Sequence, residues 1–344
     1  MPDVRDLIRK KYGETAIRKL TEVQRVDVDV IPTGSLALDY AIGAGGIPRG
    51  RVTELYGWEG SAKSTLALHS TANAQKQGLQ VLYIDTEHAL DPEYARAIGV
   101  NIDELEISQP DSAEEALNIL DAVAHTTEYG LIILDSVASL VPSAEIESDF
   151  GSAHMGLSAR LLGQAARKLP APLQNNNIAV IMINQFRANI QTGYVSPGAP
   201  KEITTGGNAL KFLASLRIRL TATAILKDGD VAIGRTITAR IDKNKVGVPF
   251  KSTKFDLVFG KGISHGYELV DLGVQTSVLT KRGAFISYGD TRIGQGRDNA
   301  RQYLEEHPEV ALNLETDVRN AFKKVTTSDG VSEMAEEEPP EELT

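Results

Sequence analysis

A short loop at residues 57–64 gives the first strong constraint on the fold. It reads Gly-Trp-Glu-Gly-Ser-Ala-Lys-Ser, follows the strand-like run 51–56 and opens into the helical run 65–69. A strand, a short loop with a lysine and a hydroxyl, and a helix form the setting of a phosphate-binding loop. Backbone N–H groups and the dipole at a helix start attract anions. Lys63 would reach the β- and γ-phosphates of a nucleotide, and Ser64 would hold Mg²⁺. A glycine-rich turn with a solvated lysine is the alternative.

One residue of this loop departs from the usual pattern. The pattern G-x-x-x-x-G-K-[ST] has glycine directly before the lysine, where this chain has Ala62. If this position needs a positive φ, alanine is strained by roughly 1 kcal/mol or more. If the position is helical, the methyl group costs little unless it crowds the phosphate. The candidate nucleotide-binding residues of the loop are Gly57, Trp58, Glu59, Gly60, Ser61, Ala62, Lys63, Ser64 and Thr65.

Two acidic residues follow apolar strands and extend the nucleotide hypothesis. Asp135 ends the strand 131–135, as the second Mg²⁺-associated acid of a P-loop ATPase should. Glu87 follows the strand 81–85, at the edge where α/β sheets bind ligands. A carboxylate there could polarise the water that attacks the γ-phosphate; a solvated or helix-capping acid is the alternative.

The order of apolar segments predicts an α/β fold. From residue 32 to about 190, helical segments such as 113–124 and 156–169 alternate with continuous apolar strands at 81–85, 131–135 and 178–184. This alternation indicates a mostly parallel sheet covered on both faces. Beyond residue 210, the alternating runs 216–220 and 236–241 indicate antiparallel strands at the sheet edge.

Four regions are expected along the chain. Residues 1–32 form an arm, with a helix at 4–12 and an extended run, that packs on its own core or on a neighbouring subunit. Residues 33–264 form the core, and residues 265–324 form a small α+β domain. Residues 325–344 are acidic and lack aromatic side chains, so we expect them to be disordered.

Two long loops, about 147–156 and 186–207, interrupt the core pattern. Such loops are usually functional or disordered. Basic residues beside them could line a groove for a phosphate backbone, and Phe150, Met155 or Ile190 could wedge between bases. Arg160 and Arg167 lie seven residues apart, on one face of a predicted helix. A solvated surface loop is the alternative.

Two lysines lie at the end of a later predicted strand. Lys243 and Lys245 are spaced i, i+2, so their side chains point the same way from an extended backbone. They could neutralise charge on a transferring phosphate, whereas most lysine pairs are merely solvated.

The charge distribution restricts a nucleic-acid site to a local patch. The net charge is −10, but residues 329–344 hold seven acids and no base, which leaves −3 for the rest of the chain. A chain of this charge is not basic overall.

The absence of cysteine excludes disulfides and thiolate metal sites. With no apolar run of about 18 residues and no signal pattern, we expect a cytoplasmic protein without a membrane partner.

Taken together, these motifs resemble the bacterial RecA recombinase family over the whole chain. Besides the phosphate loop, the matching segments are 32–36, 84–92, 134–138, 154–157, 183–187, 205–212, 243–245 and 293–296. The resemblance implies a RecA-type P-loop NTPase core with an oligomerisation arm and a small C-terminal domain. It implies a DNA-dependent ATPase that forms ATP-stabilised filaments on single-stranded DNA. That filament pairs and exchanges strands with homologous double-stranded DNA in recombinational repair and activates self-cleavage of the SOS repressor. The implied cofactors are ATP and Mg²⁺.

The resemblance also implies residue roles. Lys63, Glu87, Gln185, Lys243 and Lys245 would be catalytic, with Glu87 as the base, Gln185 as a γ-phosphate sensor, and the two lysines reaching ATP on the neighbouring subunit. Ser64 and Asp135 would hold the metal, and Asp91 and Tyr94 would contact adenine. The implied DNA contacts are Met155, Arg160, Gly163, Arg167, Arg187, Thr205, Gly206, Gly207 and Asn208. The implied subunit contacts are Ile17, Lys211, Phe212 and Arg217.

Departures from the family pattern leave alternatives open. Besides Ala62, Trp58 stands where proline is usual, Gly163 stands where serine is common, and the second loop is a few residues longer. These differences suggest a divergent lineage or a phage-encoded copy. A filament scaffold with impaired hydrolysis is the main alternative function, and a ring helicase is disfavoured because the arm and C-terminal domain match the recombinases.

Overall fold

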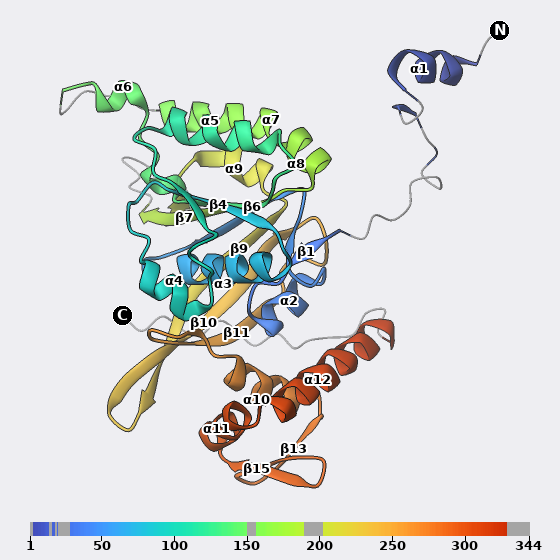
Figure 1. Ribbon diagram of the computed structural model, residues 1–344, viewed down its shortest axis with the longest axis vertical. Coiled ribbons are helices and arrows are strands. Elements are labelled where there is room, and N and C mark those ends of the chain that lie inside the picture. The colour runs from blue at the N-terminus through green and yellow to red at the C-terminus, as the bar shows by residue number, and fades with distance from the viewer. Residues whose placement is uncertain are drawn as a thin grey trace, which may run out of the picture.

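The structure is a computed structural model that describes residues 3–13, 16, 17, 19, 28–149, 156–188 and 202–328 (Figure 1). The predicted DNA wedges Phe150, Met155 and Ile190 lie outside these residues, as does the acidic segment from residue 329. Over the described ranges, no helix is both long and apolar enough to span a bilayer.

A mixed sheet forms the centre of the core. Among the described residues its order is β12-β11-β10-β9-β3-β7-β6-β4-β5, with β8 pairing with β7. The bounds are β3 (Val52–Gly57), β4 (Gln80–Asp85), β5 (Glu106–Ser108), β6 (Tyr129–Asp135), β7 (Ala179–Ala188), β8 (Glu202–Thr204), β9 (Leu216–Asp228), β10 (Val231–Asn244), β11 (Ser252–Val258) and β12 (Gly262–Ile263). Neighbours from β9 to β5 pair in parallel, whereas β9 to β12 pair antiparallel. The predicted parallel sheet with an antiparallel edge is confirmed.

Helices cover both faces of this sheet (Figure 1). One face carries α2 (Leu36–Ile42), α3 (Lys63–Lys76) and α4 (Pro92–Ile98); the other carries α5 (Ala113–Ala124), α7 (Leu157–Lys168), α8 (Pro170–Asn176) and α9 (Gly207–Leu213). Residues 131–134 of strand β6 are all apolar because both faces of the strand are buried. Leu131 and Ile133 enter one core, and Ile132 and Leu134 enter the other. Alternate strand residues point to opposite faces, so a strand buried on both sides is apolar throughout.

Short elements connect this framework. They are β1 (Val30–Ile31) paired with β2 (Ile47–Pro48), the 3₁₀ turn η3 (Val137–Ser139) and α6 (Ser143–Ile146).

The N-terminal helix α1 (Val4–Tyr12) stands away from the body (Figure 1). None of its residues is buried, and Val4 and Leu7 are exposed. The self-packed arm, one of two expectations from the sequence, is therefore absent for this helix.

A second, smaller layer of helices and strands follows the core. It comprises α10 (His265–Gln275), β13 (Leu279–Arg282), β14 (Phe285–Tyr288), β15 (Thr291–Gln295), α11 (Arg297–Glu306) and α12 (Pro308–Ser328). Its apolar cluster includes Leu36 and Ala37 of α2, so the core contributes to the packing of the C-terminal part.

A buried carboxylate joins the two parts. Glu268 of α10 accepts hydrogen bonds from Ser35 Oγ at 2.5 Å, Leu36 N at 2.8 Å and Ala37 N at 3.0 Å. These donors lie at the start of α2, where backbone N–H groups lack helical partners and the dipole favours an anion. Burial raises the pKa of Glu268, although these bonds lower it.

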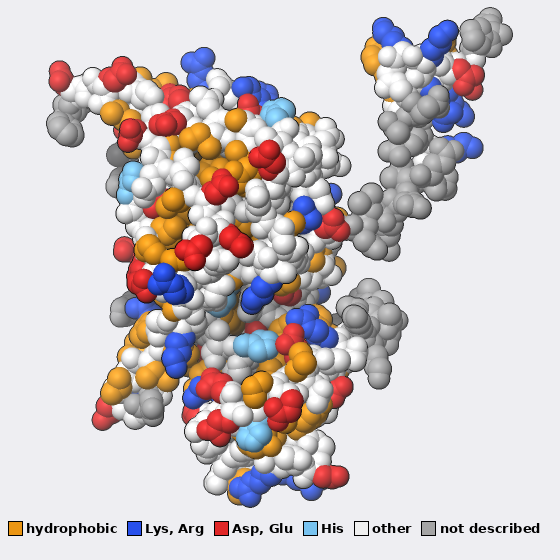
Figure 2. Space-filling view, viewed as in Figure 1, with side chains coloured by type: hydrophobic (Ala, Val, Ile, Leu, Met, Phe, Trp, Pro, Cys, Tyr) orange, Lys and Arg blue, Asp and Glu red, His pale blue; other side chains and the backbone are white. Residues whose placement is uncertain are grey.

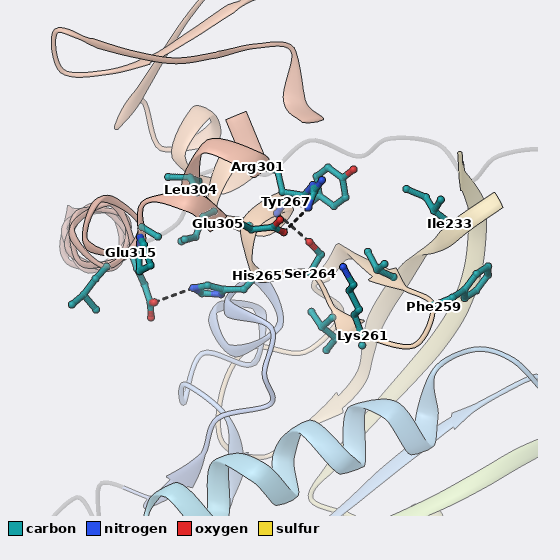
Figure 3. Close-up of a pocket in the computed structure, with 18 of the residues that line it drawn as sticks. Ile233, Phe259, Lys261, Ser264, His265, Tyr267, Arg301, Leu304, Glu305 and Glu315 are labelled. Atoms are coloured by element: carbon teal, nitrogen blue, oxygen red, sulfur yellow. Dashed lines mark hydrogen bonds and ion pairs between the residues drawn. The ribbon is translucent and has the colours of Figure 1, made fainter. Parts of the chain in front are cut away.

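Beside this junction lies a cleft of about 800 Å³ between the β10–β12 edge and helices α10 to α12 (Figure 3). His265 reaches Glu315 across it at 3.0 Å, and Arg301 pairs with Glu305 at 2.5 Å. Two charged pairs therefore lie in the cleft walls, which Lys261 also lines.

Candidate active site

The phosphate-binding loop connects β3 to α3 at the carboxyl edge of the sheet. Gly57 has no room for a side chain, since a Cβ there would lie 2.2 Å from the carbonyl oxygen of Leu220. Ser61 Oγ donates to the carbonyl oxygen of Trp58 at 2.7 Å, which closes the loop on itself. The loop borders a cavity of about 220 Å³, lined by Glu59, Gly60, Ser61, Ala62, Lys63, Ser64, Thr65, Glu87, Asp135, Ile183 and Gln185.

The N-terminus of α3 fits an anionic ligand. The N-cap residue, Ala62, makes no side-chain capping hydrogen bond, and the first turn of α3 has no acidic residue. Its backbone N–H groups and dipole are therefore available to a phosphate group. This arrangement is the one that the sequence predicted for the loop.

Ala62 adopts the left-handed backbone conformation. Its φ is 68° and its ψ is 23°, directly before the first residue of α3. Of the two options that the sequence left open, the structure therefore has the strained one, which costs an alanine about 1 kcal/mol.

Lys63 is held inside its own loop. Its Nζ donates to the carbonyl oxygens of Gly57 at 3.2 Å and Trp58 at 2.8 Å, and the residue is only 7% exposed. Burial lowers the pKa of Lys63, while the nearby acids Asp135, Glu87 and Glu59 raise it. The lysine charge is therefore placed among carboxylates at the cavity wall.

The two predicted metal ligands meet at the cavity. Ser64 Oγ donates to Asp135 Oδ2 at 2.8 Å, and Tyr83 Oη donates to the same oxygen at 2.7 Å. Burial raises the pKa of Asp135, whereas these two hydrogen bonds lower it. A hydroxyl and a carboxylate oxygen at hydrogen-bond distance fit Mg²⁺, which prefers oxygen ligands.

Glu87 and Gln185 also meet there. Glu87 Oε1 accepts from Ser136 Oγ at 2.5 Å and from Gln185 Nε2 at 3.0 Å. Both residues line the same cavity as Lys63. The site thus places a carboxylate, an amide and an ammonium around one space.

The predicted adenine contacts lie beside the loop. Asp91 caps α4, accepting from Glu93 N at 2.9 Å and Tyr94 N at 3.3 Å. Tyr94 Oη lies 3.0 Å from Thr65 Oγ1, which is in the first turn of α3. This bond ties the two helices together next to the cavity.

A buried polar layer, which the sequence analysis did not identify, lies behind Gln185. Asn184 Nδ2 donates to Glu54 Oε1 and to the carbonyl oxygen of Thr205, both at 2.9 Å. Arg217 Nε donates to Glu54 Oε2 at 2.5 Å. Glu54 is 0% exposed. Its sequence signal was an acid in the middle of an otherwise uncharged strand.

The predicted subunit contacts fall in different environments. Phe212 is 75% exposed, and Lys243 Nζ donates to the carbonyl oxygens of Lys211 at 2.6 Å and Phe212 at 3.3 Å. The side chain of Arg217 is 12% exposed, since it pairs with Glu54 inside its own chain.

The carbonyl oxygen of Ile17 accepts a hydrogen bond from the side chain of Arg9 on the arm. Neither Lys243 nor Lys245 lines the cavity of its own chain among the described residues.

The described DNA-contact candidates gather around α7 and α9. Arg160, Gly163 and Arg167 belong to α7, and Arg160 and Arg167 are exposed. A Cβ on Gly206 would lie 2.5 Å from Leu162, so the end of the second loop packs on α7. Thr205, Gly207 and Asn208 adjoin Gly206 at the start of α9. Arg187 donates to the carbonyl oxygen of Ala138 at 3.2 Å.

The visible surface carries both charge signs. Figure 2 shows acidic and basic side chains interspersed over this face. That pattern agrees with the small net charge of the chain outside its last sixteen residues.

Comparisons with known proteins cover nearly the whole chain. The family model of the RecA N-terminal domain matches residues 3–264, and that of the RecA C-terminal domain matches residues 267–323. Protein RecA of Methylococcus capsulatus is 49% identical over 313 residues, which are 91% of this chain and 89% of that protein. Protein RecA of Rickettsia canadensis is 46% identical over 330 residues, which are 96% of this chain and 95% of that protein.

A solved structure shares the core fold. The crystal structure of the RadB recombinase aligns with a TM-score of 0.51 at 23% sequence identity, covering 68% of this chain and 98% of that one. The predicted α/β P-loop fold and the resemblance given by the motifs are both confirmed. The chain belongs to the RecA family.

Proposed function

We propose that this protein is a DNA-dependent ATPase that forms ATP-stabilised filaments on single-stranded DNA and catalyses homologous pairing and strand exchange. The observation that carries the proposal is the hydrogen bond from Gln185 to Glu87 at the phosphate-loop cavity. Gln185 lies near the start of the second loop, so this bond connects the expected site of hydrolysis to the expected site of DNA binding. The family relationship supports the same function.

ATP would bind along the start of α3. The N–H groups of the helix start and Lys63 would hold the phosphates. Asp91, which caps α4, and Tyr94 within α4 would contact the adenine. Ser64 and Asp135 would hold Mg²⁺, whose charge would neutralise phosphate oxygens. The acids around Lys63 favour its charged form against burial.

Glu87 would orient and deprotonate the attacking water. Its carboxylate is fixed by Ser136 and Gln185, which leaves its second oxygen, Oε2, for the water. General-base assistance of this kind contributes roughly 10²- to 10⁴-fold to a rate. A γ-phosphate would compete for the Gln185 amide, so Gln185 would report nucleotide binding to the second loop.

Filament formation would complete the site. Lys243 and Lys245 lie outside the cavity of their own chain, and we propose that they reach ATP on a neighbouring subunit. Phe212 next to them, together with Lys211, would pack against that subunit. ATP would then stabilise the filament because it binds the assembled form better than the separate subunits.

The first and second loops would line the path of single-stranded DNA. Arg160 and Arg167 on α7, and Gly206 and Asn208 at the start of α9, lie together on one side of the sheet. Exposed arginines there would contact phosphates, while the bases remain free to pair with a homologous strand. We extend the proposal to a cytoplasmic location, double-stranded DNA as second substrate and the SOS repressor as a partner.

A filament scaffold with impaired hydrolysis is the second candidate. The positive φ of Ala62 favours it, since strain in the phosphate loop would alter how the N–H groups meet the phosphates. The intact arrangement of Glu87, Gln185 and Lys63 favours the ATPase.

Strand exchange tests the proposed function. A circular single strand and a homologous linear duplex are incubated with the full chain, Mg²⁺ and ATP, and a heterologous duplex serves as control. Joint molecules that form only with the homologous duplex support the proposal. Filaments that bind DNA without forming joint molecules would support the scaffold instead.

A further inference from the structure

An aromatic side chain of the phosphate loop touches the strand that enters the second loop. The ring centroids of Trp58 and Phe186 lie 5.8 Å apart at an interplanar angle of 48°. Phe186 also meets Tyr56 edge-on at 5.4 Å, and the Arg219 guanidinium lies 5.0 Å from its ring centroid. Aromatic pairs at such distances attract each other beyond the effect of their buried area. Phe186 therefore contacts two aromatic rings, one from β3 and one from the phosphate loop.

The sheet register produces this contact. Strands β3 and β7 pair in parallel, with Gly57 opposite Gln185. Continuation of the register by one residue brings Trp58 beside Phe186. Side chains at alternate positions share a face, so Tyr56 and Trp58 both lie on the side of Phe186.

Nucleotide binding would change the hydrogen bonding of the loop backbone at Gly57 or Trp58. A lysine ammonium has three donors, and Lys63 uses two of them for the carbonyl oxygens of Gly57 and Trp58. Contact with both the β- and γ-phosphates requires at least two donors, so Lys63 must release at least one of these carbonyls. The hydrogen bonding of the turn that carries the indole therefore depends on whether phosphate is bound.

Phe186 lies between the sensor residue and the returning strand of the second loop. It follows Gln185 directly, and it pairs with Thr204 of β8. The neighbouring Asn184 donates to the carbonyl oxygen of Thr205 at 2.9 Å. Phe186 thus lies where the two strands that flank the second loop pair with each other.

We propose that Trp58 is a positioning residue that couples the phosphate loop to the second loop through Phe186. This inference rests on the proposed function for its two ligands, ATP and single-stranded DNA. The link is separate from the Gln185 amide, because it runs through the loop backbone and two aromatic rings. Coupling of binding free energies is reciprocal, so DNA at the second loop would also act on the phosphate loop, and through Phe186 it would change the surroundings of the indole.

The chain supplies its own reporter, because Trp58 is its single tryptophan. Intrinsic emission of the full chain is recorded alone, with Mg²⁺ and a slowly hydrolysed ATP analogue, and after addition of oligo-dT. We expect one change with the analogue and a second change with DNA. Phe186→Leu should remove the DNA-dependent change and lower the ratio of hydrolysis rates with and without DNA by about fivefold or more.

Two further variants control for a general effect. Phe259→Leu alters an aromatic side chain on the β11–β12 turn that is 48% exposed, close to the 47% of Trp58, and should keep both responses. Phe186→Tyr retains a ring and should restore the responses lost in Phe186→Leu, which excludes simple misfolding as the cause.

Two results would overturn the inference. In the first, DNA stimulates hydrolysis in the unmodified protein, yet Trp58 emission does not respond to DNA. In the second, Phe186→Leu keeps the full response. If the unmodified protein shows neither DNA binding by fluorescence anisotropy nor stimulated hydrolysis, the proposed function fails as well, so the two failures are distinguishable.

Discussion

Gln185 Nε2 donates a hydrogen bond to Glu87 Oε1 at 3.0 Å, although the two residues are 98 positions apart in the chain. Gln185 lies on β7, and Glu87 follows β4; β6 lies between these strands. The carboxyl ends of parallel strands meet at one edge of a sheet, which is why the two side chains can meet. The predicted base and the predicted sensor are thus joined by a direct hydrogen bond.

Glu87→Gln should abolish most hydrolysis without abolishing nucleotide binding. The amide keeps the size of the side chain but accepts no proton, so the rate of phosphate release should fall by about 10²-fold or more. Glu93→Gln, which removes an exposed carboxylate on α4 paired with Arg96, is the matched control and should leave the rate unchanged. Equal rates in all three proteins would refute the role of Glu87.

Ala62→Gly should raise stability. Glycine adopts a φ of 68° without strain, so the free energy of unfolding should rise by about 1 kcal/mol. Ala122→Gly, at an exposed position inside α5, should lower it by about 0.5–1 kcal/mol. Urea unfolding of the three proteins shows whether each variant is more or less stable than the unmodified protein. A lower unfolding midpoint for Ala62→Gly would contradict the strain at Ala62.

Arg217→Leu should be strongly destabilising. The variant leaves the Glu54 carboxylate buried without its partner, at a cost of about 3–5 kcal/mol. Arg96→Ala breaks an exposed ion pair instead and should change stability by less than about 1 kcal/mol. The double variant Glu54→Gln with Arg217→Leu should recover part of the loss. Similar midpoints for Arg217→Leu and Arg96→Ala would show that the buried pair contributes little.

Asp39→Asn should change how stability depends on pH. Burial raises the pKa of Asp39 to about 7 from its ordinary 3.8, and the bonds from Thr33 lower it only partly. When the pH lies between these two pKa values, the folded state keeps a proton that the unfolded state has lost. Folding stability therefore falls as the pH rises from about 4 to about 7. The difference between the folded and unfolded pKa of Asp39 corresponds to at most about 4 kcal/mol of folding stability.

The asparagine keeps the oxygen acceptor and has no proton to lose, so its unfolding midpoint should fall less between pH 5 and pH 8. Asp103→Asn removes an exposed carboxylate and should retain the slope of the unmodified protein. Identical slopes for Asp39→Asn and the unmodified protein would contradict a role for this carboxylate. Glu268, whose pKa burial also raises, contributes to the slope that remains.

The local sequence was sufficient to predict several residues that line the cavity and to predict the mostly parallel sheet. Lys63 and Ser64 open the helix after the loop that follows β3, Glu87 follows β4, and Asp135 ends β6. The strand ends of a parallel sheet converge on one edge. Apolar runs bounded by helices specify a sheet buried on both faces. For these features, the information lies within a few residues of the feature itself.

Other features depend on residues that are distant in the chain. The contact of Glu54 with Asn184 and Arg217 requires the register of three strands, which no single segment reveals. The φ of Ala62 depends on how the loop closes between β3 and α3. Helix α12 begins at Pro308, a residue that is well accommodated in a first helical turn, and it runs to Ser328. The expectation of disorder from residue 325 is therefore wrong for residues 325–328.

The most direct measurement is phosphate release from ATP by the unmodified chain, with and without single-stranded DNA, beside Glu87→Gln. We predict strong stimulation by DNA in the unmodified protein and its loss in Glu87→Gln. Hydrolysis that is equally fast without DNA, or that persists in Glu87→Gln, would contradict a DNA-dependent ATPase built on this site.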